Sequence, residues 1–107
     1  MPKLIYHANF LESYHRISNY GYAIFGEKSA DKFDKTLRSI VKILKVFPLS
    51  FRQENSLRGL NVEYRSVVLL RNWKIVYRYE EERDDVHLID IWDNRSNPDV
   101  LWKNFKE

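Results

Sequence analysis

The 107-residue sequence contains no cysteine, no long apolar run and no strong excess of either charge. The absence of cysteine excludes disulfide bonds, thiolate catalysis and metal sites built from thiolates. The longest apolar runs are four residues, such as residues 67–70, far short of the roughly 20 that cross a bilayer as a helix. The first residues also lack the apolar core of a signal peptide. We therefore expect a cytoplasmic protein with no membrane partner.

The composition and length indicate one folded domain, which we expect to span residues 1–107. Hydrophobic residues make up 44% of the chain and aromatic residues 15%, which is too apolar for a disordered chain and enough for one modest core. The net charge is +3, but residues 52–78 contain six Lys and Arg against two Asp and Glu, whereas residues 79–107 contain four against nine. A mild basic excess gives only weak support for a nucleic-acid partner.

Two successive amphipathic helices are predicted in the first half of the chain. Asn9, with a glutamate three residues later, has the spacing of a capping box, and Gly26 suits a helix C-terminus, which together predict a helix over about residues 10–25. Ser29 is expected to cap a second helix that ends before Pro48. The apolar stripe of this second helix consists of Phe33, Leu37, Ile40, Val41 and Leu44.

The remaining runs predict a small sheet. A short strand over residues 3–6 precedes the helices, and three β-rich runs follow them, at residues 64–70, 73–79 and 86–92. Asn97 and Pro98 predict a short C-terminal helical segment. The order β-α-α-β-β-β predicts an α+β domain in which a two-helix hairpin packs on one face of a small antiparallel sheet. The other face of the sheet is expected to be free for binding or catalysis.

The second half of the chain carries several short motifs. They are Leu-Arg-Gly at residues 57–59, Tyr-Arg at 64–65, Trp-Lys-Ile-Val-Tyr-Arg at 73–78 and Asp-Asn-Arg at 93–95. Together with the element order, these motifs resemble the RelE/ParE superfamily of bacterial type II toxins. The resemblance implies a cofactor-free toxin that a cognate antitoxin protein neutralises, in a module of the kind associated with plasmid stabilization. RelE-like members cleave mRNA on the ribosome without a metal, as endoribonucleases called mRNA interferases, whereas ParE-like members poison DNA gyrase.

The resemblance also implies a cationic site. In RelE-like cleavage the ribose 2′-hydroxyl attacks the neighbouring phosphate, and convergent cations stabilise the charge that develops there. The positions that match this cationic set are Arg65, Lys74 and Arg95. Possible auxiliary residues, which could bind phosphate or exchange a proton, are Arg78, His87 and Tyr77.

Two departures from the RelE-like pattern leave the reaction open. Val67 stands where RelE-like strands carry a second lysine, and Leu101 and Trp102 stand near the position of the C-terminal tyrosine. We therefore predict growth inhibition through ribosome-associated mRNA cleavage, with the general base unassigned. The alternatives are a non-enzymatic poison of DNA gyrase and a catalytically silent module that binds its antitoxin.

Each candidate site residue also has a purely structural interpretation. Lys74 could cover the ring of Trp73 with its stem, and Arg95 could form an ion pair with Asp93 or Asp90 that holds the turn after the last strand. His87 could be a hydrogen-bonded structural histidine. The only other histidines, at positions 7 and 15, lie eight residues apart with no third ligand, so no metal site is predicted.

Overall fold

The computed structural model describes residues 1–95 of the chain. Its elements are β1 (Lys3–Tyr6), α1 (Ala8–Phe25), α2 (Glu27–Val46), the 3-10 helix η1 (Asn55–Leu57), β2 (Arg65–Leu69), β3 (Trp73–Glu80) and β4 (Asp85–Asp93). The predicted order β-α-α-β-β-β and the α+β class are confirmed. The helical segment predicted at Asn97 and Pro98 lies outside the described residues.

The four strands form one mixed sheet in the order β1-β4-β3-β2. The last three strands form the predicted antiparallel meander, but β1 pairs with β4 in parallel, with Leu4 opposite Val86. This parallel pair was not predicted, because β1 and β4 are separated by both helices and nothing local in the sequence couples them. The register between β3 and β4 shifts between Val76 and Tyr77.

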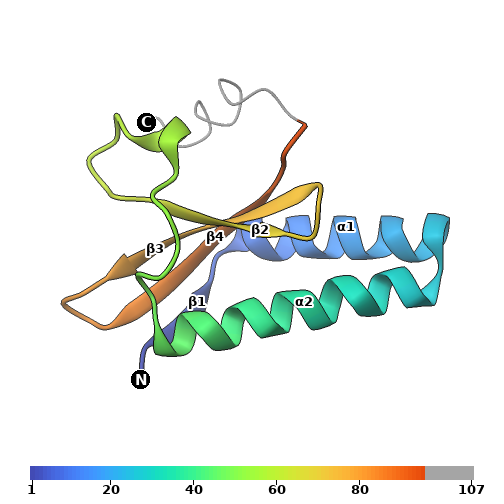
Figure 1. Ribbon diagram of the computed structural model, residues 1–107, viewed down its shortest axis with the longest axis horizontal. Coiled ribbons are helices and arrows are strands. Elements are labelled where there is room, and N and C mark those ends of the chain that lie inside the picture. Colours follow the sequence, from blue (N-terminus) through green and yellow to red (C-terminus); the bar gives the residue numbers. More distant parts are fainter. Residues whose placement is uncertain (96–107) are drawn as a thin grey trace.

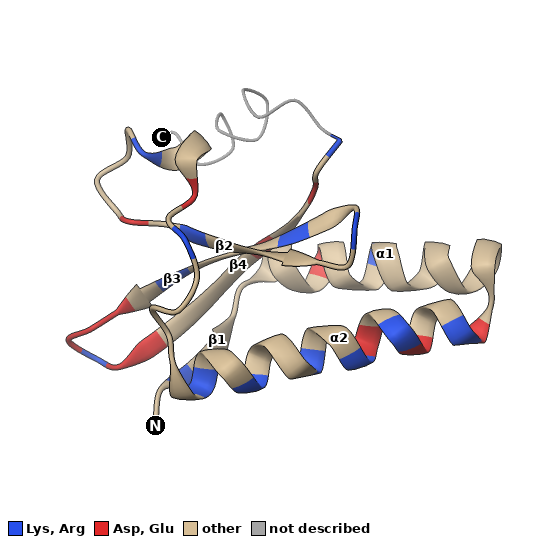
Figure 2. Ribbon diagram, viewed as in Figure 1, with Lys and Arg blue, Asp and Glu red and all other residues tan. Residues whose placement is uncertain are grey.

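The two helices form a hairpin that covers one face of the sheet (Figure 1). The predicted apolar stripe of α2 is confirmed, because four of its five members are buried and Val41 packs against them. The core on this face comprises Phe10, Ile17, Phe33, Leu37, Ile40, Leu44, Leu69, Ile75, Tyr77, Val86, Leu88 and Ile91. Charged residues occur along the length of α2 (Figure 2), and none of them is buried, as expected of an amphipathic helix.

The start of α1 differs from the prediction. The helix begins at Ala8, so Asn9 lies inside it, and the prediction of an N-cap at Asn9 is wrong. The residue before the helix is His7, which has an extended backbone (ψ 157°) and makes no side-chain cap. Its N–H donates to the carbonyl of Leu88 at 3.0 Å. Pairing with β4 therefore continues to the last residue before the helix, and the chain has turned into α1 before it reaches Asn9.

A single glycine joins the two helices. Gly26 has a φ of 89°, a backbone conformation that residues other than glycine rarely adopt. It ends α1, as predicted. It also begins α2, which starts at Glu27 rather than after Ser29. The helix ends at Val46, before Pro48, as predicted. Across residues 1–95 neither helix combines the length and the apolar character that a membrane span requires.

The face of the sheet opposite the helices is partly covered, so the expectation of a wholly free face is wrong. The segment 52–64 lies across it and buries a second, smaller cluster, formed by Leu57, Val76 and Trp92 with Leu60 and Tyr64 packed against them. Val76 and Trp92 are apolar residues on the side of the central strands β3 and β4 that faces away from the helices. The segment that covers them removes their apolar surface from water. Two backbone hydrogen bonds hold the start of this segment beside β2: the N–H of Glu54 donates to the carbonyl of Tyr64, and the N–H of Ser66 donates to the carbonyl of Arg52.

Candidate functional site

Arg65 is the first residue of β2 and lies on the helix-covered side of the sheet. Side chains alternate along a strand, and Val67 and Leu69 both pack in the core under the helices. The guanidinium donates from Nη1 to the carbonyl of Phe51 at 2.6 Å and from Nη2 to Glu63 at 3.1 Å. Only 18% of the Arg65 side chain is exposed. Its donors therefore bind the chain on either side of segment 52–62, which precedes β2.

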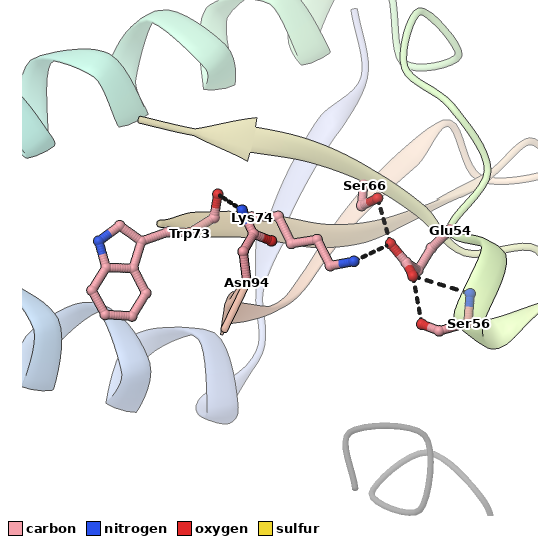
Figure 3. Close-up of polar contacts among 6 residues, drawn as sticks. All are labelled: Glu54, Ser56, Ser66, Trp73, Lys74 and Asn94. Atoms are coloured by element: carbon pink, nitrogen blue, oxygen red, sulfur yellow. Dashed lines mark hydrogen bonds and ion pairs between the residues drawn. The ribbon is translucent and has the colours of Figure 1, made fainter. Parts of the chain in front are cut away.

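Lys74 lies on the opposite side of the sheet, within a hydrogen-bonded cluster (Figure 3). Its Nζ donates to Oε1 of Glu54 at 2.7 Å and lies 5.4 Å from the centroid of the Trp92 ring. The hydroxyl of Ser66 donates to the same carboxylate oxygen at 2.7 Å, and Ser56 donates its N–H and its hydroxyl to the other oxygen. The predicted contact of Lys74 with an aromatic ring is found, but the ring is Trp92 rather than Trp73.

Glu54 is the centre of this cluster and is only 5% exposed. Burial alone would raise the pKa of its carboxyl, but hydrogen bonds from Lys74, Ser56 and Ser66 lower that pKa to about 2. The carboxylate is therefore charged at neutral pH and balances the charge of Lys74. Sequence reasoning did not identify Glu54. The available signal was its position, because it is one of only two acidic residues in the basic segment 52–78.

Arg95 lies just beyond the end of β4 and pairs with Asp93. Its Nε and Nη2 donate to the two carboxylate oxygens, each at 2.9 Å, and its backbone N–H donates to the same group at 2.8 Å. These hydrogen bonds hold the pKa of Asp93 below its usual value. The guanidinium carbon lies 5.9 Å from the centroid of the Trp73 ring. Of the two ion pairs predicted for Arg95, the pair with Asp93 is observed, whereas Asp90 accepts a hydrogen bond from Ser13.

Asn94, between Asp93 and Arg95, connects the end of β4 to the turn between β2 and β3. The backbone N–H of Asn94 donates to the carbonyl of Asn72 at 2.7 Å. Its side-chain amide lies 3.3 Å from the carbonyl of Trp73 (Figure 3) and 3.5 Å from that of Arg71. The Asp-Asn-Arg motif thus closes one end of the sheet through hydrogen bonds within the motif and to the turn between β2 and β3.

The auxiliary residues that could exchange protons are held by internal partners. Tyr77 is fully buried, and its hydroxyl donates to the carbonyl of Pro48 at 2.9 Å. Burial raises the pKa of Tyr77 to about 12, so it keeps its proton at neutral pH. His87 lies on the other side of the sheet, with Nδ1 2.8 Å from Nε2 of His7 and Nε2 3.2 Å from Glu80. Burial lowers the pKa of His7, and the nearby charge of His87 lowers it further.

The structure does not bring the three predicted cations to one point. Lys74 and Arg78 share the side of β3 that faces away from the helices, Arg65 lies on the helix-covered side, and Arg95 follows the end of β4. Arg78, which was predicted as an auxiliary residue, makes no hydrogen bond or ion pair within residues 1–95. The catalytic roles of these residues stay predictions.

A set of possible metal ligands lies at the opposite end of β3 and β4 from Arg95. Glu80, Asp85 and His87 each offer one ligand atom, and these atoms lie within 4.8 Å of one another. His7 adjoins this set through its contact with His87, although sequence spacing had associated it only with His15. The pairing of His7 with His87 joins residues 80 positions apart, which no local pattern predicts.

An apolar cleft of about 300 Å³ lies between the helix hairpin and the β2–β3 turn. Its lining includes Ile17, Tyr20, Phe25, Phe33, Leu70, Trp73 and Arg95. Beside it, the hairpin tip projects past the sheet (Figure 1). The large hydrophobic residues at this tip are between 58% and 67% exposed, and they are Tyr20, Tyr22, Ile24 and Phe25. An exposed apolar patch of this kind, next to an apolar cleft, is typical of a surface that binds another protein.

Comparisons with known proteins agree with this architecture. Residues 4–98 match the family model described as the ParE toxin of the type II toxin-antitoxin system, parDE. No curated protein matches the sequence. The matched range includes both helices, β2 to β4 and all of β1 except Lys3.

Three solved structures share the fold at low sequence identity. A chain of the chromosomal ParDE toxin-antitoxin system from P. aeruginosa is 16% identical with a TM-score of 0.68, and the match covers 87% of this chain and 96% of that one. A metal-bound toxin from Helicobacter pylori is 14% identical with a TM-score of 0.64, covering 88% and 96%. The isolated E. coli RelE toxin is 15% identical with a TM-score of 0.55, covering 99% and 97%. At these identities the likeness concerns the fold alone.

Proposed function

We propose that this chain, which belongs to the ParE toxin family of type II toxin-antitoxin systems, inhibits growth by binding DNA gyrase rather than by cleaving RNA. The observation that carries the proposal is the arrangement of the three predicted cations. Each has an internal partner, and they lie on different sides of the sheet. Gyrase and ribosomes are both in the cytoplasm, so a cytoplasmic location is part of the proposal.

The physical reason concerns charge. Cleavage by an attacking 2′-hydroxyl needs positive groups that are free to converge on one phosphate in the transition state. Glu54 balances the charge of Lys74, and Asp93 balances that of Arg95. Each cation would therefore bring little net positive charge to a phosphate unless its carboxylate partner moved away. Binding a protein target needs no such rearrangement, because the cleft and the hairpin tip already expose apolar surface.

The family also implies a cognate antitoxin, and the exposed hairpin tip is the surface that we propose for it. Tyr22 and Phe25 are 60% and 67% exposed, whereas segment 52–64 already covers part of the sheet face that sequence reasoning favoured. Hydrogen exchange of the free toxin and of the complex tests this assignment. Protection of amides near residues 20–30 supports it, whereas protection confined to residues 64–78 would return the antitoxin to the sheet.

A single induction experiment separates the two targets. The toxin is expressed without its antitoxin, mRNA 5′ ends are mapped, and DNA breaks and gyrase supercoiling activity are measured in parallel. We expect growth arrest with intact mRNA, DNA breaks and inhibition of purified gyrase. New mRNA ends at fixed positions within codons, absent for Arg95→Ala, would instead establish a ribosome-dependent ribonuclease.

RNA cleavage remains the second candidate because of one observation. Arg78 has no hydrogen-bond or ion-pair partner within residues 1–95, and it shares a face of β3 with Lys74 and, across the β3–β4 register, with His87. A cation and a histidine on one face could bind and process a phosphodiester. If the mapped mRNA shows cleavage, Arg78→Ala and His87→Ala are the variants to test next.

A further inference from the structure

The hairpin that joins β3 and β4 gathers acidic and imidazole groups on the sheet face opposite the helices. Asp85 and His87 are two positions apart on β4, so their side chains lie on the same side of that strand. Glu80 is the register partner of Asp85 on β3. The connecting turn is strongly acidic (Figure 2), since residues 80–85 contain five carboxylates and one arginine. This end of the sheet therefore attracts cations.

The distances within this group suit a small metal ion. One carboxylate oxygen of Glu80 lies 3.2 Å from Nε2 of His87. Two ligands at about 2.1 Å from a tetrahedral zinc ion are themselves about 3.4 Å apart, so this pair already has the required separation. The Asp85 carboxylate completes a set of three atoms within 4.8 Å of one another.

Asp85 supplies an independent indication of a ligand. The residue is only 7% exposed, yet within residues 1–95 its side chain has no hydrogen-bond donor and no ion-pair partner. The carboxylate oxygens of Asp85 still reach solvent, because they are not among the fully buried, unpartnered polar atoms of residues 1–95. A carboxylate in so buried a residue, with no protein donor, is stabilised by binding a cation. His87 is 9% exposed, whereas the side chain of Glu80 is 34% exposed, which leaves a route from solvent to the group.

We propose that Glu80, Asp85 and His87 bind a divalent transition-metal ion of the zinc class. One imidazole nitrogen and two carboxylate oxygens are ligands that Zn²⁺ accepts, with solvent as the fourth. The bound ion clamps the end of the β3–β4 hairpin. The site lies at the opposite end of these strands from Arg95 and does not depend on the toxin's target.

His7 orients the metal ligand. When Nε2 of His87 binds the ion, its Nδ1–H donates across the 2.8 Å contact to Nε2 of His7. Such a second hydrogen bond fixes the tautomer and the ring plane of a metal-bound histidine. Because His7 directly precedes α1, it also connects the proposed metal site to the first strand and the first helix.

Zinc binding to the purified full-length chain tests the proposal. Competition with a chromophoric zinc chelator should show one site per chain. Asp85→Asn should weaken it at least about tenfold and His7→Gln by about 10- to 100-fold, the usual effect of losing a ligand's hydrogen-bond partner. His15→Ala is the matched control, because His15 is exposed on α1 and should leave the affinity unchanged. Circular dichroism confirms that each variant is folded.

Cobalt and NMR provide a readout on the unmutated chain. Co²⁺ should give the visible absorption of a four-coordinate site, and added Zn²⁺ should shift the His87 Nε2 resonance. The proposal is overturned if Asp85→Asn and the unmutated chain bind zinc equally, if His15→Ala weakens binding as much as Asp85→Asn does, or if the His87 resonance does not respond. None of these results bears on gyrase or mRNA.

Discussion

The two faces of the sheet are covered in different ways. On one face, two long helices bury a continuous set of aliphatic and aromatic side chains. On the other, segment 52–64 buries only a small apolar cluster and is anchored by backbone hydrogen bonds and by a buried ion pair, between Glu54 and Lys74 at 2.7 Å. The first face is held mainly by non-directional packing, whereas the cover of the second relies more on directed hydrogen bonds, several of which converge on the Glu54 carboxylate.

The difference bears on function. The helices cover most strand side chains of the first face, which reaches the surface at the cleft beside Trp73. A site made of several strand side chains is therefore expected on the second face. There the anchoring ion pair occupies Lys74, one of the cations expected to act on a phosphate. The segment that covers Val76 and Trp92 thus also supplies the carboxylate that pairs with Lys74, and this pairing is the reason for proposing a binding function.

Removing volume from the helix-covered face should have the largest effect on stability. Leu88 is fully buried beneath the helices, and Leu88→Ala should lower the free energy of unfolding by roughly 2–5 kcal/mol in chemical denaturation. Val68→Ala is the control, since Val68 is 60% exposed and its loss should cost no more than about 0.5 kcal/mol. If the two variants lowered the free energy of unfolding equally, packing beneath the helices would not be the main source of stability on that face.

Glu54→Gln should have the next largest effect and should act on the second face. The pKa of Glu54 falls from 4.5 to about 2 on folding, which corresponds to roughly 3 kcal/mol of stability at neutral pH. Because the folded pKa is the lower one, this contribution is complete above pH 4.5 and is lost as the pH falls toward 2. Denaturation at pH 7 and at pH 3 should therefore show a smaller difference between variant and unmutated chain at pH 3.

Glu63→Gln is the matched control for that measurement. Glu63 also pairs with a cation, Arg65, but its side chain is 53% exposed, and exposed pairs contribute about 0–1 kcal/mol. The change should be small at both pH values. If Glu54→Gln were as mild as Glu63→Gln, the Glu54 cluster would not anchor segment 52–64.

The parts of this structure that could be predicted are those with a local pattern. The stripe from Phe33 to Leu44 repeats with the helical period, Pro48 stops a helix whatever surrounds it, and the pair of Asp93 with Arg95 joins residues two positions apart. These features depend on neighbours in the chain, so the sequence displays them directly.

The parts that were missed join residues far apart in the chain. The parallel pairing of β1 with β4, the contact of His7 with His87 and the pair of Glu54 with Lys74 depend on how the elements pack. A lone glutamate in a basic segment indicates a partner but does not say which cation it will meet. For this reason the resemblance to RelE-like toxins grouped Arg65, Lys74 and Arg95 as one site, whereas the folded chain separates them.

Arg95→Ala should have the smallest effect on stability, which makes it the cleanest probe of function. Its pair with Asp93 is exposed, with 67% of the arginine side chain accessible, and water and salt screen such pairs. The thermal midpoint should stay within a few degrees of the unmutated chain, as it should for Arg38→Ala, whose pair with Asp34 is similarly exposed. If only Arg95→Ala lowers the midpoint, the turn after β4 is structural and any loss of toxicity reflects folding. If both midpoints hold and only Arg95→Ala abolishes toxicity, Arg95 contacts the target, and the mRNA map then shows whether that target is the ribosome.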